Sequence, residues 1–440
     1  MKHKMKIVFS FFSIVLMLLL GVSGCSSSQG GSTNGGGSGG KKVQLTMSAW
    51  GNPAELKVYQ KAIDAFNQQH ADIQVKLVPI PSDGYQQKIL TQLSGGKAPD
   101  VFYVGSEWIS QLIKNGSVVN LTEFLSSSES YSKPEEFSEG LWGAARKDGQ
   151  IYGVPVDCNP ALLYYNKKVL KEAGVKSPQE YFDEGKWNWD TFTEVTGKLR
   201  DAGKYGFVAE NNWFNLFSWV WTNGGQLYDD NGNIILDQNE KAQEAIRYLD
   251  KMIDQKNFIY AGSLPKGQGP DAMFMSNQVG FVAAGRWLTP MFSENKSLEF
   301  DYIPWPTNTG NKTEPAAVAT AYLAANKDSK YVKEAMKFLS FYVSQEGQKA
   351  RLSGNGNAVP SINGIENIVV DAGIPEHAQY LIDARNIGLV DDKQSVVPGM
   401  DKEVNDIMDL MYLNKKNADE TIKAVTEKVK TMTENYRNSQ

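Results

Sequence analysis

The chain has 440 residues, with 45 Lys and Arg against 50 Asp and Glu and a formal net charge of −5. This mildly acidic balance argues against nucleic acid as a partner. Two Cys and three His are too few for a histidine-rich or cysteine-rich metal site, and we expect no cofactor.

Residues 1–24 predict a signal peptide rather than a part of the fold. Three lysines precede an apolar run over residues 7–20, which has the length of a signal core and is short for a membrane span. The following Val22-Ser23-Gly24-Cys25 has the form of a bacterial lipobox, in which the thiol of Cys25 carries the lipid. An ordinary secretory signal with a chance cysteine is the alternative.

Residues 25–42 predict a lipidated cysteine followed by a flexible linker. Nearly all of them are Ser, Gly, Asn, Thr and Gln, so they have almost no apolar side chain to bury. A lipid, a linker and a globular body indicate an extracytoplasmic protein anchored to the outer face of the bacterial cell membrane. If Cys25 is lipidated, Cys158 has no partner for a disulfide and is expected to be a small unreactive side chain.

The remaining body of about 400 residues exceeds what one hydrophobic core usually supports, so we expect two lobes. Strand patterns over 43–47, 73–77 and 98–104 alternate with helical patterns, which predicts a layered α/β sheet. Ligands of such sheets lie beyond the carboxyl ends of the strands. Trp50, which ends the first strand, is therefore a candidate ligand contact.

The segment 152–167 predicts a crossing between the lobes. Its two prolines favour an extended chain, and an apolar run follows them. Asp157 and Asn159 lie between the apolar stretches, so their side chains are expected to face the gap between the lobes. The alternative for both is a hydrogen bond to neighbouring backbone.

The later segments predict a second lobe and a return to the first. Trp213, Trp219 and Trp221 are crowded into nine positions, and one or two of them are expected in the core. The strand pattern over 300–303 and the apolar run over 317–325 are expected to return to lobe 1. The predicted domains are a signal peptide over 1–24, a linker over 25–42, lobe 1 over 43–155 plus 296–350, and lobe 2 over 156–295 plus 351–440.

Several short segments resemble the solute-binding proteins of ATP-driven sugar importers, extracellular family 1. The resemblance spans about 43–440 in order, and these segments lie at residues 98–101, 152–167, 187–192, 285–287 and 344–361. The resemblance implies a two-lobed α/β fold of the class II periplasmic-binding-protein type with a hinge of two or three crossing segments. It also implies a monomer that captures a carbohydrate, with an oligosaccharide favoured, and delivers it to the permease of an ABC importer. Because the chain has no Walker-type phosphate loop, the ATPase must be a separate subunit.

A sugar site needs flat rings for the C–H faces and fixed polar groups for the hydroxyls. The resemblance places Asp100 at the cleft and Trp287 against the sugar, with a tryptophan plugging the core or an aspartate capping a turn as alternatives. Glu107 is a further candidate, although a glutamate at a helix start often serves the helix dipole. Arg286 is expected to pair with an acidic sugar or with a carboxylate of the protein. The predicted ligand contacts are Trp50, Asp100, Glu107, Asp157, Asn159, Trp213, Trp221 and Trp287.

Two other classes of function stay open at this point. A surface glycoside hydrolase or lyase needs two carboxylates across a sugar bond, for which Asp100, Glu107 and Asp157 are candidates. The resemblance argues against an enzyme. A metal or peptide binder is disfavoured by the few His and Cys and by the ten tryptophans.

Overall fold

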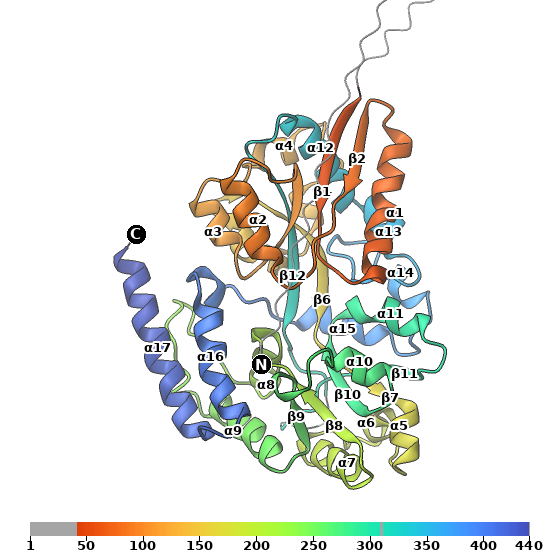
Figure 1. Ribbon diagram of the computed structural model, residues 1–440, viewed down its shortest axis with the longest axis vertical. Coiled ribbons are helices and arrows are strands. Elements are labelled where there is room, and N and C mark those ends of the chain that lie inside the picture. The colour runs from red at the N-terminus through yellow and green to blue at the C-terminus, as the bar shows by residue number, and fades with distance from the viewer. Residues whose placement is uncertain (1–41, 309, 311, 440) are drawn as a thin grey trace, which may run out of the picture. The chain divides into compact units, whose positions relative to one another are not determined.

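The computed structural model describes residues 42–308, 310 and 312–439 (Figure 1). The predicted signal peptide, Cys25 and all of the predicted linker except Lys42 lie outside the described residues. Among the helices of the described residues, none combines the length and the apolar character that crossing a membrane requires.

The first sheet has five strands in the order β2-β1-β3-β12-β6. β1 runs parallel to β2 and β3, whereas β12 runs antiparallel to both β3 and β6. Figure 1 shows the long β12 and β6 side by side. The strands are β1 (Val43–Ser48), β2 (Ile73–Leu77), β3 (Val101–Gly105), β6 (Val154–Pro160) and β12 (Val318–Ala325). The helices packed with this sheet are α1 (Pro53–Gln69), α2 (Tyr85–Ser94), α3 (Ile109–Lys114), α4 (Thr122–Ser126), α12 (Val332–Val343) and α13 (Gln345–Leu352).

The second sheet has the order β11-β7-β10-β8-β9. β8 runs parallel to β9 and β10, and β7 runs antiparallel to β10 and β11. Its strands are β7 (Leu162–Asn166), β8 (Tyr205–Ala209), β9 (Phe258–Tyr260), β10 (Val279–Ala284) and β11 (Phe300–Ile303). Its helices are α5 (Lys167–Glu172), α6 (Pro178–Asp183), α7 (Trp189–Asp201), α8 (Trp213–Thr222), α9 (Glu240–Asp254), α10 (Pro270–Met275), α11 (Thr289–Glu294), α14 (Asn367–Val370), α15 (Gln379–Ile387), α16 (Met400–Tyr412) and α17 (Ala418–Asn438). We call the first sheet with its helices the first half and the second sheet with its helices the second half.

Small elements complete the described chain. β4 (Arg146–Lys147) and β5 (Gln150–Ile151) form a two-stranded ladder. Six short 3₁₀ helices lie at Pro134–Glu136, Glu139–Leu141, Gly143–Ala145, Ala261–Ser263, Arg286–Leu288 and Gln394–Val396.

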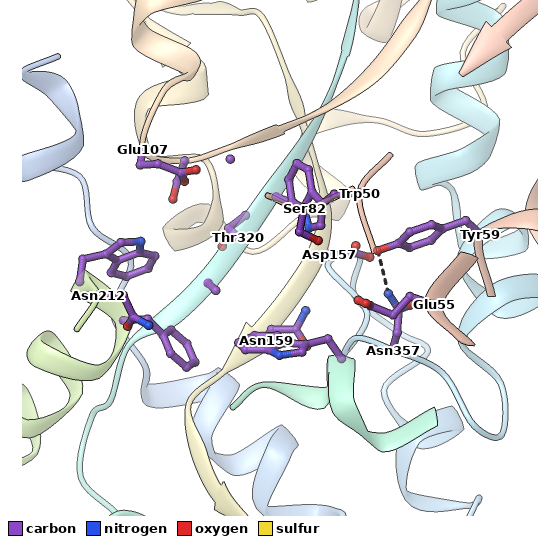
Figure 2. A pocket seen from close by; sticks show the side chains of 17 residues that line it. Trp50, Glu55, Tyr59, Ser82, Glu107, Asp157, Asn159, Asn212, Thr320 and Asn357 are labelled. Carbon is purple, nitrogen blue, oxygen red and sulfur yellow. Dashed lines mark hydrogen bonds between the residues drawn. The ribbon is translucent and has the colours of Figure 1, made fainter. Parts of the chain in front are cut away.

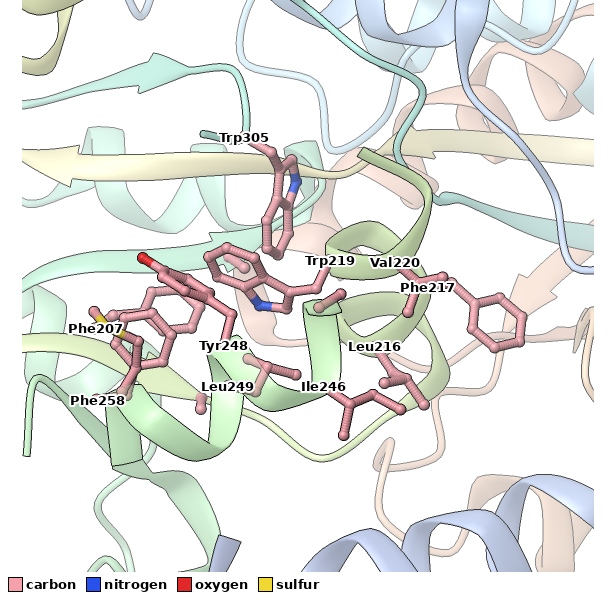
Figure 3. Packing of buried hydrophobic residues seen from close by; sticks show 14 of the residues in the cluster. Phe207, Leu216, Phe217, Trp219, Val220, Ile246, Tyr248, Leu249, Phe258 and Trp305 are labelled. Atoms are coloured by element: carbon pink, nitrogen blue, oxygen red, sulfur yellow. The ribbon is translucent and has the colours of Figure 1, made fainter. Parts of the chain in front are cut away.

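Each half has its own hydrophobic core, as the length of the body predicted. In the first half, β1 and β3 bury Met47, Phe102 and Val104 against helices such as α1. In the second half, α8 and α9 pack their apolar faces on the sheet around Trp219, which is 1% exposed (Figure 3). The mixed α/β class is therefore confirmed.

Three stretches of chain connect the halves. The first is the step from β6 to β7 at Ala161, the second runs from β11 to β12 over 304–317, and the third leaves α13 over 353–366 toward α15. α15 packs in a core cluster with β10 of the second sheet. Buried Ser361 bonds back to the first crossing, with its Oγ donating to the carbonyl of Pro155 at 2.7 Å.

One strand lies in a different sheet from the one expected. Phe300–Ile303 was expected to return to the first lobe, but β11 pairs antiparallel with β7 of the second sheet, from Phe300 opposite Asn166 to Ile303 opposite Leu163. Its Tyr302 ring packs 4.7 Å from the ring of Tyr164. The chain returns to the first half only after Ile303, so the expected boundary at 296 is wrong for this strand. The expected boundary between 155 and 156 also falls inside β6, which belongs to the first sheet along its whole length.

Candidate functional site

A cavity of about 400 Å³ is lined by residues of both halves. We call it the central cavity. Figure 2 shows its labelled side chains converging on one space from β6, β12, α1 and the loops around them. It holds five aromatic side chains, three carboxyl groups, three asparagine amides and several hydroxyl groups.

Strand ends position most of these side chains. Trp50 follows β1, and Ser106 and Glu107 follow β3, at the carboxyl ends of two parallel strands. In the second half, Asn212 follows β8 and Trp287 follows β10, which are also parallel. The arrangement agrees with the rule that α/β sheets bind ligands beyond the carboxyl ends of their strands.

Glu55 enters the cavity because the first turn of α1 is fixed by a capping box. The Asn52 side chain accepts the N–H groups of Ala54 and Glu55, and Glu55 Oε2 accepts the N–H of Asn52 at 2.9 Å. Pro53 at the first helical position favours this start. Burial, with a smaller contribution from Asp157, raises the pKa of Glu55 from 4.5 to about 7.

Glu107 has the same unusual character on the other side of the cavity. Burial raises its pKa from 4.5 to about 7, and the nearby Asp401 of α16 adds to the effect. Glu55 and Glu107 are therefore two carboxyl groups that lose their protons near neutral pH.

Asp157 differs from both glutamates because it has a cationic partner. Its Oδ1 accepts a hydrogen bond from Nη1 of Arg351 at 2.5 Å, and the Arg351 side chain is fully buried. Arg351 also donates to the carbonyl of Val156 and lies 5.2 Å from the ring centroid of Tyr342. Asp157 thus joins β6 to α13 while one edge of its carboxylate remains at the cavity wall.

Two amides and two hydroxyl groups line the cavity together with the carboxyl groups. The Oδ1 of Asn159 accepts the backbone N–H of Arg286 at 2.9 Å, which fixes the amide between the two halves. Asn357 donates to the hydroxyl of Tyr59 at 3.1 Å, the bond drawn in Figure 2. The Oδ1 of Asn357 and the Oγ1 of Thr320 are buried and have no hydrogen-bond partner among the described residues. Since an unpaired buried polar atom costs free energy, these two atoms favour a ligand that bonds them.

The rings form two groups. Trp50 packs edge-on against Tyr85 and Tyr103, with centroids 5.0 and 5.4 Å apart. Across the cavity, Phe214 lies 5.3 Å from Trp287 and 5.9 Å from Trp213. All three indoles stay partly exposed, so a ligand can still reach them.

The family model for bacterial extracellular solute-binding proteins matches residues 50–349. The chain belongs to this family. Residues 50–349 contain the first two connections between the halves and nearly all of the cavity lining, so the match covers the site as well as the fold.

This solute-binding protein is similar in sequence to several binding proteins and in fold to several solved structures. The arabinooligosaccharide-binding protein of Bacillus subtilis is 25% identical over 362 residues, 78% of each chain, and the maltodextrin-binding protein MdxE of the same organism is 27% identical over 360 residues, again 78% of each. A substrate-binding protein of Listeria monocytogenes in complex with cycloalternan superposes with a TM-score of 0.79 at 21% identity, over 89% of this chain and 99% of the other. The two-lobed α/β fold predicted from the sequence is confirmed.

The family also decides between a binding protein and an enzyme. Its members and the relatives named above are binding proteins, and nothing in the comparisons supports a glycoside hydrolase or lyase. Asp100, one of the carboxylates considered for catalysis, does not line the central cavity. We conclude that the chain is an extracytoplasmic solute-binding protein and not an enzyme.

Six of the eight predicted ligand contacts of this solute-binding protein come together in the central cavity, and two do not. Asp100 lies at the amino end of β3, on the edge of the sheet away from the cavity. Its carboxylate accepts the N–H of Thr46 at 2.7 Å and the hydroxyl of Ser329 at 2.6 Å. Its expected place at the cleft is therefore wrong, and it bonds β1 and the turn after β12 instead. The six that line the cavity are Trp50, Glu107, Asp157, Asn159, Trp213 and Trp287.

Trp221 and Arg286 also differ from expectation. Trp221 packs its ring 4.8 Å from Phe217 at the far end of α8 and is absent from the cavity lining. Arg286 is fully buried and has no carboxylate partner within the part of the chain that the structure describes. It donates to the carbonyl of Leu352 at the end of α13 and to those of Gly354 and Ala358 on the third connection.

A cluster of possible metal ligands lies away from the central cavity. Asp301, Glu376 and His377 present ligand atoms within 4.8 Å of one another. However, the ammonium of Lys167 lies 3.0 Å from Asp301 Oδ2 and 3.4 Å from Glu376 Oε2, and His377 Nδ1 is 2.9 Å from Asp301 Oδ2. The ammonium of Lys167 already offsets the charge of these carboxylates, so we interpret the cluster as a network of polar contacts around Lys167.

Several cavity residues were missed by the sequence analysis. Glu55 and Tyr59 lie in the first two turns of the helix after β1, and Asn212 and Phe214 follow β8. The rule that selected Trp50 could have selected these four as well. Thr320 and Asn357 come from the middle of a strand and from the third connection, where no local pattern marks them.

Proposed function

We propose that this protein binds an oligosaccharide in the central cavity and delivers it to the permease of an ABC importer. The observation that carries the proposal is the joint presentation of partly exposed indoles and buried polar groups by both halves. Rings match the C–H faces of sugars, and amides, carboxyls and hydroxyls match their hydroxyl groups. The names of the relatives, an arabinooligosaccharide-binding and a maltodextrin-binding protein, support the same class of ligand.

The length of the ligand follows from a second cavity beside the first. A space of about 810 Å³ is lined by residues of α2 and α16, and it shares Trp50, Ser82 and Glu107 with the central cavity. We call it the side cavity. A ligand of several sugar units can place one part in each cavity, whereas a monosaccharide occupies only one. This continuity supports an oligosaccharide over a monosaccharide.

The mechanism is capture without chemistry. We propose that the two halves act as lobes that open about the three connections. The ligand enters the open form and shifts the population toward the closed form, because contacts from both lobes form only on closure. The permease then recognises the closed protein, with ATP hydrolysis supplied by a separate subunit.

A lipid on Cys25 and the linker over 25–42 fit the same role. The lipobox-like sequence Val22-Ser23-Gly24-Cys25 supports this anchor. A tethered binder stays near the permease, which raises its effective concentration there. We propose that the protein acts as a monomer at the outer face of the cell membrane.

A thermal-shift panel tests the ligand class. A ligand that binds only the folded state stabilises it by about 2.7 kcal/mol at a concentration one hundred times its Kd. We expect at least one of maltotriose, cellotriose, xylotriose, arabinotriose and N,N′-diacetylchitobiose to raise the Tm, and to raise it more than its monosaccharide at equal concentration. A panel without any shift would contradict the proposal, and a monosaccharide that matches its oligomer would contradict the length.

A further inference from the structure

The charged side chains that line the central cavity all carry the same sign. Within the described part of the chain they are Glu55, Glu107 and Asp157, and no Lys, Arg or His lines the space. Arg351 pairs with Asp157 and donates to the carbonyl of Val156, so its charge offsets that of Asp157 and not that of either glutamate. Glu55 and Glu107 take part in no ion pair among the described residues. The cavity therefore has uncompensated acidic character.

Other cations near the site cannot supply the missing charge. The guanidinium of Arg286 points to the third connection, where it donates to the carbonyls of Gly354 and Ala358. Lys402 lines the side cavity, but it pairs with Asp406 one turn away on α16. The side cavity also presents Asp401, which adds negative charge beside Glu107. The acidic character thus continues where the two cavities meet.

Of the two unpaired polar atoms of the cavity, Oδ1 of Asn357 only accepts, whereas the hydroxyl of Thr320 can donate or accept. Asn357 and Thr320 are 1% and 3% exposed, and Oδ1 of Asn357 is an acceptor without a partner. A carboxyl group that has lost its proton also only accepts. Hydroxyl and ammonium groups donate to such atoms, whereas a carboxylate or phosphate of a ligand would face them as another acceptor. In a poorly hydrated site, like charges repel more strongly than in water.

We propose that the site selects sugars by charge, accepting neutral and amine-bearing oligosaccharides and rejecting uronic acids and sugar phosphates. Glu55 and Glu107 are the specificity-determining residues, one on each side of the cavity (Figure 2). This inference rests on the proposed function, because it assigns a ligand class within the same site.

The test compares matched ligands that differ only in charge. The measurements are made at pH 8, above the pKa of about 7 of Glu55 and Glu107, so that both are ionised. Maltotriose, cellotriose and xylotriose are each measured by calorimetry beside a derivative with one terminal carboxylate, and maltotriose and cellotriose also beside a terminal 6-amino-6-deoxy derivative. We expect the carboxylate form of any sugar that binds to be at least tenfold weaker than its neutral parent. The amino form is expected to bind at least as tightly as the parent.

Two variants and one control assign the selectivity to residues. Glu107→Gln and Glu55→Gln should each reduce the discrimination against the carboxylate form by threefold or more, and Gln at position 55 can still accept the N–H of Asn52. Glu434→Gln removes an exposed carboxylate of α17 and should change nothing. If only one of the two Gln variants folds, that variant is sufficient to test the inference, because the two acids act from different elements.

The outcomes separate the two proposals. A carboxylate form that binds within threefold of its neutral parent overturns the charge inference and leaves the sugar-binding function standing. Unchanged discrimination in both glutamine variants also overturns it, because the selectivity would then have another origin. Binding of none of the three neutral sugars, together with an empty thermal-shift panel, overturns both.

Discussion

The two halves line the central cavity with different chemistry. The first half supplies mainly acids and hydroxyls, including Glu55, Tyr59 and Glu107. The second half supplies mainly rings, with Phe214 in α8 and Trp287 in the 3₁₀ helix after β10. Trp50 is the exception, an indole held by the first half. A sugar needs both kinds of contact, so neither half alone offers a complete site. This division gives a physical reason for the ligand to favour the closed arrangement.

Each half also contributes one fully buried arginine near the connections, and the two are satisfied differently. Burial lowers the pKa of Arg286, which donates to backbone carbonyls on the third connection. Burial also opposes the charge of Arg351, but Asp157 together with Tyr103 and Tyr342 outweighs it and raises the pKa of Arg351 above its usual value. Arg351 therefore belongs to an ion pair, whereas Arg286 acts as a donor to the main chain. Removal of Arg351 therefore leaves the charged carboxylate of Asp157 without a partner, whereas removal of Arg286 leaves only uncharged carbonyl groups unpaired.

Arg351→Met should have the largest effect on stability. The change leaves the carboxylate of Asp157 buried without its cation, and breaking a buried pair in this way costs about 3–5 kcal/mol. Denaturant unfolding of the free protein measures the loss. The double variant Asp157→Asn with Arg351→Met should recover part of the stability, because no unpaired charge remains. A loss of unfolding free energy below about 1 kcal/mol in the single variant would show that the pair contributes no more than a solvent-exposed ion pair does.

Trp287→Ala tests the second half's contribution to binding. Removal of this ring should weaken binding of a panel oligosaccharide more than tenfold, about 1.4 kcal/mol, because the stacking surface beside Phe214 is lost. Calorimetry measures the affinity, and circular dichroism checks that the variant is folded.

Trp221→Ala is the matched control for that change. It removes an indole that packs on Phe217 of the same half but does not line the cavity. We expect the Tm to fall while the Kd stays within threefold of the parent. Equal losses of affinity in both variants would mean that Trp287 acts through the fold of the second half rather than by contact with the sugar.

The sequence predicted the features that follow from local pattern. Strand and helix alternation gave the α/β class, and the ends of strands pointed to Trp50. The proline-rich segment predicted the crossing, since Pro155 and Pro160 both lie in the extended β6 immediately before Ala161. Asp157 and Asn159 reach the cavity because alternate residues of this strand share one face.

The failures concern features set by pairing between distant segments. The composition of β11 predicts a strand but does not indicate which sheet the strand joins. Its sheet is set by its pairing with the edge of β7, which is distant in the sequence. Asp100 precedes its strand, so its place was taken from the resemblance, while hydrogen bonds to Thr46 and Ser329 hold it at the opposite edge. Thr320 becomes a cavity residue only because β12 lies between β3 and β6. No local pattern in one sequence encodes these pairings.

The acids of the first half should make the stability of the free protein depend on pH. The pKa values of Glu55 and Glu107 rise from 4.5 to about 7 on folding, so the folded protein binds more protons than the unfolded chain between these values. Their stabilising contribution is complete below about 4.5 and is lost as the pH rises through 7. One pKa unit corresponds to about 1.4 kcal/mol, so we expect the unfolding free energy to fall by at least that amount from pH 5 to pH 8.

Other buried acids, such as Asp391, whose pKa burial also raises to about 7, add to the pH dependence of the parent protein's stability. The Gln variants are therefore needed to assign part of this dependence to a single residue. The difference between the parent and Glu55→Gln should itself depend on pH: the variant gains relative stability at pH 8 and loses that advantage at pH 5. Glu434→Gln should follow the parent at every pH, since its side chain is exposed. A difference between the parent and Glu55→Gln that is constant from pH 5 to pH 8 would mean that Glu55 ionises normally in the folded protein. The first half would then oppose anionic ligands with ordinary surface carboxylates, and the selectivity against uronic acids should weaken at high ionic strength.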